Sequence, residues 1–125
     1  MSEHRRILIV DDEARMRRFV RMNLELEGFE VLEASDGLEA IRKAREELPD
    51  LVILDLMMPN MHGLDSLRKV LSINPNIPVI IHTAYSHYKD NFMSWAAEEY
   101  IVKSADLSEL KGAIKRVLAS RTVSK

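Results

Sequence analysis

The part of this chain that most constrains its fold is residues 51–63, which read LVILDLMMPNMHG. Four consecutive apolar residues, β-branched in the middle, end abruptly in the carboxylate of Asp55. An unbroken apolar run of this length is typical of a strand that is buried on both faces, as in a parallel sheet. Open α/β sheets bind ligands at the carboxyl ends of their strands, so Asp55 is predicted to lie at a binding edge. Pro59 and Gly63 shape the following loop, because Pro59 fixes φ and Gly63 permits conformations closed to other residues.

Four further segments have the composition of strands, and they alternate with segments of helical spacing. Residues 7–10 repeat the pattern of an apolar run halted by acids, and the other predicted strands are residues 30–34, 78–83 and 100–103. The predicted helices cover about residues 13–27, 36–48, 63–73, 87–97 and 107–120. Five strands alternating with five helices predict an α/β fold, a single doubly wound parallel sheet with helices on both faces.

Apolar residues at helical spacing predict which side chains of these helices face the core. Asp36 is expected to cap the second helix and Gly28 to end the first. The predicted inward residues are Met16, Phe19, Val20 and Leu24 in the first helix; Ala40, Ile41, Ala44 and Leu48 in the second; Leu64, Leu67, Val70 and Leu71 in the third; and Leu107, Leu110, Ile114, Val117 and Leu118 in the last.

Composition limits the class of protein. The 125 residues are 46% apolar and 30% charged, which predicts one globular domain over 1–125, with a core of about 5–120 and a frayed tail at 121–125. A net charge of −2 offers no bulk attraction for nucleic acid or an anionic membrane. The chain has no cysteine, which excludes disulfides and thiolate metal sites and fits a reducing compartment. The early apolar run is too short for a signal peptide core or a membrane span. We therefore expect a cytoplasmic domain. It is expected to be either free-standing or excised from a larger protein, and the first is favoured because no linker composition begins by Lys125.

The predicted strand ends bring a set of chemical groups to one edge of the sheet. The first strand delivers Asp11 and Asp12, the third Asp55, the fourth Thr83 and the fifth Lys103. Three carboxylates in one place repel one another unless a cation neutralises them. Carboxylate and carbonyl oxygens suit Mg²⁺, which usually keeps several waters and takes one or two carboxylates. A carboxylate can also attack phosphorus as a nucleophile and form an acyl phosphate.

Each of these residues has a purely structural alternative when taken alone. Asp12 could cap a helix, and Asp55 could accept hydrogen bonds from nearby backbone N–H groups. Thr83 is a good strand former, and Lys103 could be a solvated strand end. The alternatives weaken together, because four separate elements would each have to end in a suitable group by chance.

Taken together, the motifs resemble those of the response-regulator receiver domains of two-component signalling, including chemotaxis regulators, over essentially the whole chain. The matching residues are Asp11 and Asp12, Asp55 with Met58, Pro59 and Gly63, Thr83 with Ala84, and Tyr100 with Lys103. The resemblance implies a flavodoxin-like receiver fold with strand order 2-1-3-4-5. It also implies that the chain is a signalling switch rather than an enzyme, and that it assists its own phosphorylation and dephosphorylation.

The resemblance further implies a phosphoacceptor and a metal site. Asp55 would receive phosphate from a histidine kinase or a histidine phosphotransfer protein. Mg²⁺, with Mn²⁺ able to substitute, would be bound directly by Asp12 and mainly through water by Asp11. Asp55 and the backbone carbonyl of Met57 would complete the protein ligands.

A switch and its partners follow from the same resemblance. Lys103 and the Thr83 hydroxyl would hold the phosphoryl oxygens, and Tyr100 would be the aromatic whose ring moves with Thr83. Phosphorylation would alter a protein-interaction surface around the predicted helix 87–97, the fifth strand and the last helix. The partner would be a downstream output protein, and the chain would be a monomer or weak dimer that does not contact nucleic acid directly.

Several positions depart from the family pattern or add to it. Ser104 stands where the family usually has proline after the lysine, so we expect a trans bond with a rearranged loop, or a cis bond held by surrounding contacts. Met57 and Tyr85 are bulky residues beside the site, which predicts slow loss of the phosphoryl group. Trp95 is interpreted as a packing residue, with a place on the partner surface formed by the fourth helix and the fifth strand as the alternative. Arg15, Arg17, Arg18 and Arg21 form a solvated face, with Arg15 and Arg18 as candidates for contact with the kinase.

Three other functions stay open. An aspartyl-phosphate-forming phosphatase or phosphotransferase would usually carry its nucleophile after the first strand and need a cap domain. A flavodoxin-like nucleotide or flavin binder would need a glycine-rich loop after the first strand, where this chain is acidic. A receiver could also serve as a constitutive protein-binding module.

Overall fold

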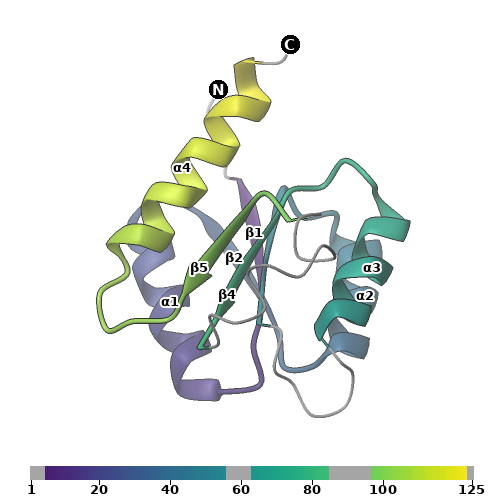
Figure 1. The fold of residues 1–125 in the computed structure, drawn as a ribbon, viewed down its shortest axis with the longest axis horizontal. Coiled ribbons are helices and arrows are strands. Elements are labelled where there is room, and N and C mark those ends of the chain that lie inside the picture. The colour runs from purple at the N-terminus through teal and green to yellow at the C-terminus, as the bar shows by residue number, and fades with distance from the viewer. Residues whose placement is uncertain (1–4, 56–62, 85–96, 124–125) are drawn as a thin grey trace.

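The computed structural model describes residues 5–55, 63–84 and 97–123 (Figure 1). The five strands are β1 (Arg6–Val10), β2 (Glu30–Ala34), β3 (Leu51–Leu54), β4 (Val79–Thr83) and β5 (Glu99–Val102). All neighbouring strands are parallel, and the order β2-β1-β3-β4-β5 confirms the predicted fold and strand order.

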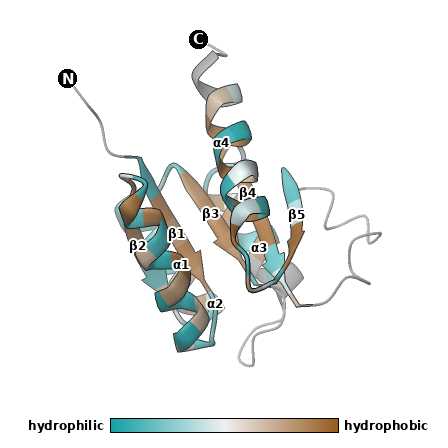
Figure 2. Cartoon of the chain, turned by 90° about the vertical axis from the view of Figure 1, so that its left-hand side faces the viewer, coloured by the Kyte–Doolittle hydropathy of each residue, from teal (hydrophilic) through white to brown (hydrophobic). Residues whose placement is uncertain are grey.

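Helices cover both faces of this sheet (Figures 1 and 2). The described residues contain α1 (Ala14–Leu26), α2 (Gly37–Glu47), α3 (Gly63–Ile73) and α4 (Ser108–Val123). Helices α1 and α4 pack into one buried cluster with the sheet, and α2 and α3 pack into the other. The predicted helix 87–97 falls almost entirely outside the described residues.

The alternation of side chains along the central strands explains their unbroken apolar runs. In β3, Leu51 and Ile53 belong to the cluster under α1 and α4, while Val52 and Leu54 belong to the cluster under α2 and α3. Successive side chains of a strand point to opposite faces, so a strand covered on both sides needs apolar residues at every position. Figure 2 shows β1 and β3 in the colours of hydrophobic residues.

Local signals determined several helix ends as predicted. The Asp36 carboxylate accepts a hydrogen bond of 2.9 Å from the backbone N–H of Glu39 and so caps α2. Gly28 follows α1 with a φ of 98°, and its N–H donates to the carbonyl of Glu25 at 3.0 Å. A positive φ at this position favours glycine, which has no Cβ to clash.

Three predictions about the helices are wrong. Phe19 is 40% exposed, because the contact of α1 with the core follows Met16, Val20 and Leu24 along a single i, i+4 row. Leu48 is 71% exposed and lies in the left-handed region at φ 51°, since it ends α2 instead of extending its buried face. Helix α4 continues to Val123, so residues 121–123 are helical rather than frayed.

The other predicted inward residues are largely confirmed. All five residues predicted to face inward from the last helix are buried, although Leu107 lies just before α4. Val20, Leu24, Ala40, Ala44, Leu67 and Val70 are buried as well. Ile41 is half-buried, and Leu71 is partly buried against the core under α2 and α3. The side chain of Leu64 is outside the part that the structure describes. Among the described residues, no helix has both the length and the apolar character needed to span a membrane.

Candidate functional site

The parallel sheet brings four strand ends to one edge. Asp11 follows β1, Asp55 follows β3, Thr83 is the last residue of β4, and Lys103 follows β5. Backbone hydrogen bonds continue the sheet past these ends: the N–H of Asp55 donates to the carbonyl of Val10 at 2.9 Å, and that of Lys103 to the carbonyl of Thr83 at 2.7 Å. The predicted site residues on different strands are therefore neighbours.

Three carboxylates form the acidic part of this site. Oxygen atoms of Asp11, Asp12 and Asp55 all lie within 4.8 Å of one another. Asp11 and Asp55 are buried, at 2% and 5% exposure, whereas Asp12 is exposed. A donor set made only of oxygen atoms, with one exposed carboxylate beside solvent, fits a hard divalent ion such as Mg²⁺ that keeps several of its waters.

The structural alternative for Asp12, that it caps the first helix, does not hold. The residue that caps α1 is Glu13, and its side chain makes no capping hydrogen bond. The backbone N–H of Glu13 instead donates to the Asp11 carboxylate at 2.9 Å. The carboxylate of Asp12 is therefore not engaged as the helix cap.

Lys103 lies between the two buried carboxylates. Its ammonium nitrogen is 2.8 Å from Oδ2 of Asp11 and 2.9 Å from Oδ2 of Asp55, and its side chain is only 11% exposed. Burial opposes the charged form, but the hydrogen bonds to Asp11 and Asp55 outweigh it and raise the pKa of Lys103. The lysine is thus a charged counter-ion inside the site, and its alternative as a solvated strand end is wrong.

Burial dominates the ionisation of Asp11. It raises the pKa of this carboxyl even though Lys103 and the Glu13 N–H act in the opposite direction. A second negative charge, on Asp55, adds to the increase. Burial and the charge of Asp55 both disfavour the ionised form of Asp11. A cation bound beside these carboxylates would offset both effects and favour the ionised form.

Thr83 and Tyr100 share one face of the sheet. Ile81 and Thr83 are two positions apart on β4, so their side chains point to the same side. Tyr100 pairs with Ile81 in the register between β4 and β5, and its ring packs, partly buried, against the same cluster as Ile81. Thr83 itself is fully buried. A change in the position of the Thr83 side chain would therefore occur on the side of the sheet that carries Tyr100.

His82 lies between Ile81 and Thr83 in sequence but points to the opposite face of β4. It is 3% exposed, and burial lowers its pKa to about 4, with the charge of Lys103 acting in the same direction and that of Asp55 against it. The imidazole is consequently neutral near pH 7.

The bond between Lys103 and Ser104 is trans, since none of the described peptide bonds is cis. The loop that follows is organised by short polar contacts. The Ser104 hydroxyl donates to the carbonyl of Asp106 at 2.7 Å, and the Asp106 carboxylate accepts from the N–H of Ser108 at 2.8 Å. Of the two expected geometries, the chain therefore adopts the trans bond with its own loop structure.

Sequence reasoning missed the position of Arg17. It treated this residue as part of a solvated face, but its side chain is only 18% exposed and donates to the backbone carbonyl of Asp11 at 2.7 Å. Arg15 and Arg18, by contrast, are exposed as predicted. The available signal was that Arg17 directly follows the core residue Met16 and lies three positions before Val20, at the margin of the buried face.

Several predicted residues lie outside the part of the chain that the structure describes. They are Met57, Met58 and Pro59 after Asp55, together with Tyr85 and Trp95. The predicted roles of Met57 as a carbonyl ligand, of Met57 and Tyr85 in the phosphoryl lifetime, and of Trp95 as a packing residue stay predictions.

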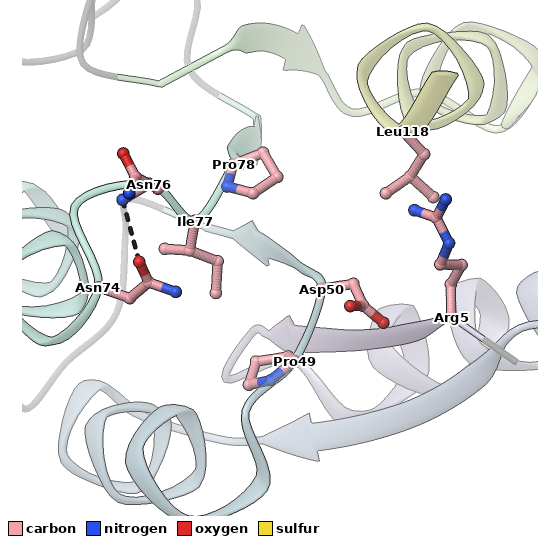
Figure 3. A pocket seen from close by; sticks show the side chains of 8 residues that line it. All are labelled: Arg5, Pro49, Asp50, Asn74, Asn76, Ile77, Pro78 and Leu118. Carbon is pink, nitrogen blue, oxygen red and sulfur yellow. Dashed lines mark hydrogen bonds between the residues drawn. The ribbon is translucent and has the colours of Figure 1, made fainter. Parts of the chain in front are cut away.

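A cavity of about 210 Å³ lies at the opposite, amino-terminal edge of the sheet (Figure 3). Its lining includes Arg5, Asp50 and Pro78, which come directly before β1, β3 and β4. The Asp50 carboxylate already accepts the backbone N–H of Arg6 at 2.8 Å, and Asn74 accepts that of Asn76 at 3.0 Å. The cavity is smaller than typical ligand pockets and contains none of the predicted site residues.

Comparison with known proteins identifies similar chains. The family model of the response regulator receiver domain matches residues 7–115. The probable transcriptional regulatory protein TcrX of Mycobacterium tuberculosis is 38% identical over 90% of this chain and 49% of its own length. The chain spans about half the length of the curated relatives it matches.

Two solved structures are similar over nearly the whole fold. The response regulator TrrA of Thermotoga maritima, in complex with Mg²⁺ and beryllium fluoride, is 42% identical with a TM-score of 0.86, covering 90% of this chain and 97% of that one. TrrA in complex with the histidine kinase ThkA has a TM-score of 0.85 at 42% identity, covering 91% and 98% of the two chains.

Proposed function

We propose that this chain, which belongs to the response regulator receiver family, accepts a phosphoryl group on Asp55 from a phosphohistidine donor and so switches a protein-interaction surface. Receiver domains are signalling switches rather than enzymes acting on a small-molecule substrate. One observation carries the proposal: the buried Asp55 carboxylate lies beside two further carboxylates and 2.9 Å from the ammonium of Lys103. Anionic ligands and a cationic group thus surround a single nucleophile.

We assign Mg²⁺ to the acidic part of the site. Asp12 would bind it directly, Asp11 mainly through water, and Asp55 and the Met57 carbonyl would supply further oxygens. When bound, the ion supplies charge neutralisation for the oxygens of a phosphoryl group. The presence of Mg²⁺ with beryllium fluoride in the similar protein TrrA supports this assignment.

The chain's own residues perform the transfer. An oxygen of Asp55 forms the new bond to phosphorus, while the bond from phosphorus to the donor's imidazole nitrogen breaks. The electron pair of the broken bond stays on that nitrogen. The reacting form of the donor is the phosphohistidine protonated on its other ring nitrogen, and it therefore leaves as neutral imidazole. Lys103 keeps its proton throughout, orients Asp55 and pairs with the negative oxygens of the transferred group.

Phosphorylation then changes the balance between two conformations of the site. The phosphoryl group adds charge and hydrogen-bond acceptors next to the Thr83 hydroxyl, and Tyr100 lies on the same face of the sheet. We propose that this couples Asp55 to β5, to α4 and to the region 87–97, where an output protein would bind. Helix α4 is joined to β5 by a two-point ion pair, in which Arg116 contacts both carboxylate oxygens of Glu99 at 3.1 Å.

The phosphohistidine donor would dock over α1. Only Glu13 separates this helix from the acidic pair, and the helix exposes Arg15, Arg18, Phe19 and Met22. Exposed cations beside exposed apolar side chains suit a partner surface of helices with acidic rims. The complex of TrrA with a histidine kinase supports a partner of this class.

Phosphorylation by a small-molecule donor tests the proposal. The protein is incubated with Mg²⁺ and acetyl phosphate, and intact mass is followed for the wild type, Asp55→Asn and Asp65→Asn, the last being an exposed aspartate on α3. We expect the mass to rise by one phosphoryl group in the wild type and in Asp65→Asn, but not in Asp55→Asn.

Other outcomes would favour the other functions. Lack of any mass increase with acetyl phosphate and with phosphohistidine donors would favour a constitutive binding module. Multiple turnover of small phosphate esters that depends on Asp55 would favour an aspartyl-phosphate-forming phosphatase or phosphotransferase.

A further inference from the structure

Arg17 connects the acidic site to the neighbouring strand β2. Its Nη1 atom donates to the backbone carbonyl of Asp11 at 2.7 Å, and its Nε atom lies 2.8 Å from Oε1 of Glu33. These contacts use two different edges of one planar guanidinium group, which therefore has a defined orientation. The side chain is largely buried, so solvent does not compete freely for either contact.

Glu33 is itself held from several sides. Its second carboxylate oxygen contacts Arg21 at 2.5 Å, and its backbone carbonyl accepts from the ammonium of Lys43 on α2 at 2.6 Å. Burial opposes the charge of Glu33, but the hydrogen bonds from Arg21 and Arg17 outweigh it and lower the pKa of this carboxyl. Glu33 is thus a fixed anion that anchors Arg17 to the sheet.

The acceptor of the Arg17 hydrogen bond, the backbone carbonyl of Asp11, lies between the two carboxylates Asp11 and Asp12 in the chain. The carbonyl of Asp11 belongs to the planar peptide unit that joins Asp11 to Asp12, so its direction determines where the backbone of Asp12 begins. The N–H of Asp11 is held in turn by the carbonyl of Ala34 at 3.1 Å, next to Glu33 in the chain. The exposed Asp12 side chain starts from this supported peptide.

We infer that Arg17 is a positioning residue for the divalent cation, which holds the peptide between Asp11 and Asp12 so that the Asp12 carboxylate faces Asp11 and Asp55. The inference rests on the proposed function, because it concerns the same Mg²⁺ site. It assigns to Arg17 a role in ligand geometry, and to Glu33 the role of aligning Arg17 and balancing its charge.

Charge alone and the positioning role predict opposite changes in Mg²⁺ affinity when Arg17 is removed. Arg17 is a cation near a cation site, so its removal should strengthen Mg²⁺ binding if charge alone mattered. The positioning role predicts weaker binding instead, because residues that orient metal ligands typically contribute about 10- to 100-fold in affinity. The direction of the change therefore separates the two effects.

The test is calorimetric titration of the full chain with Mg²⁺ alone, in the absence of any phosphodonor. Arg17→Ala is compared with Arg21→Ala. Both variants remove a positive charge from the Glu33 carboxylate, but among the described contacts only Arg17 binds the Asp11 carbonyl. We expect the Kd for Mg²⁺ to rise about tenfold in Arg17→Ala and to stay within about twofold of wild type in Arg21→Ala. Arg17→Lys, which can make one of the two contacts, should lie in between.

Each outcome has a defined meaning. Unchanged or tighter binding in Arg17→Ala overturns the inference, and so does an equal loss in both alanine variants. If Arg17→Ala does not fold in urea-unfolding controls, the pair Arg17→Lys and Arg21→Lys decides the question by the same criterion. Absence of Mg²⁺ binding in the wild type would instead count against the proposed function, as would binding that Asp12→Asn leaves intact.

Discussion

The ammonium nitrogen of Lys103 lies 2.8 Å from a carboxylate oxygen of Asp11, although the two residues come from opposite ends of the chain. The same nitrogen is 2.9 Å from Asp55. All three side chains are nearly inaccessible to solvent, at 11%, 3% and 7% exposure. One positive charge therefore lies between two buried carboxylates and offsets part of their mutual repulsion before any phosphate or metal arrives.

Replacement of this lysine should destabilise the fold. Lys103→Met leaves Asp11 and Asp55 close together without their counter-ion, and loss of one partner of a buried ion pair costs about 3–5 kcal/mol. Urea unfolding should show a loss of this order near pH 7. Lys111→Met is the control, because Lys111 is 29% exposed and lies 3.8 Å from Glu27, and it should change stability by about 0.5 kcal/mol or less.

Mg²⁺ should restore part of the stability that Lys103→Met loses. A cation bound at the carboxylates stabilises the folded state in proportion to its affinity, and that affinity rises when the competing ammonium is absent. We expect Mg²⁺ to stabilise the variant more than the wild type. An equal or smaller effect in the variant would show that Lys103 and the metal do not share these carboxylates.

His82 makes the stability of the protein sensitive to mild acid. Its pKa is about 4 in the folded protein, below the ordinary value of 6.5, so between these pH values the unfolded chain binds a proton that the folded protein does not. Stability therefore falls as the pH drops from 6.5 to 4, by up to about 3 kcal/mol from this residue. In His82→Asn the free energy of unfolding should depend less on pH over that interval. Parallel curves for the two proteins would contradict the buried, neutral state of His82.

Leu48 is a site at which glycine should stabilise the protein. This exposed leucine ends α2 at φ 51° and ψ 62°, a region that costs an L-residue with a Cβ roughly 1–2 kcal/mol. Leu48→Gly removes that cost, and after the greater entropy of the unfolded chain is subtracted we expect a gain of about 0.5–1 kcal/mol. Leu38→Gly, at an exposed leucine within the same helix, should lower the stability instead, because glycine is a poor helix former. Thermal unfolding measures the change in stability of each variant. Losses of stability of equal size in the two variants would exclude strain at Leu48.

The lifetime of the phosphoryl group should depend on Met57 and Tyr85. Neither residue has an acid or amide group to orient water, so we expect slow hydrolysis in the wild type. Met57→Asn introduces an amide that can hold a water molecule, and decay of phosphorylated Asp55 should accelerate on the order of tenfold. Tyr85→Ala should also accelerate decay by admitting solvent. Met22→Asn, on the exposed face of α1, is the matched control, and unchanged or slower decay in the Met57 variant would refute the prediction.

Much of the fold could be predicted because its signals are local. The apolar runs of β1 and β3, the carboxylate of Asp36 and the glycine at position 28 each act within a few residues of where they stand. The buried faces of α2, α3 and α4 also follow helical periodicity closely. Periodicity does not determine how wide the buried face is, however, and for that reason it places Phe19 in the core and Arg17 in the solvent, the reverse of what the structure shows.

The chain by itself determined which chemical groups terminate which strands: Asp11 and Asp12 after β1, Asp55 after β3, Thr83 at the end of β4 and Lys103 after β5. It also determined that these ends share an edge, since alternating strands and helices produce a parallel sheet. Only the tertiary structure decided that Lys103 reaches across to Asp11 and that Arg17 supports the Asp11 carbonyl. For Lys103, the physical reason is that the assembled sheet brings residues from the start and the end of the chain to one edge, which no local pattern encodes. For Arg17, whose acceptor is only a few residues away, helical spacing places the side chain at the margin of the buried face, and the ion pair with Glu33 on β2 decides its direction.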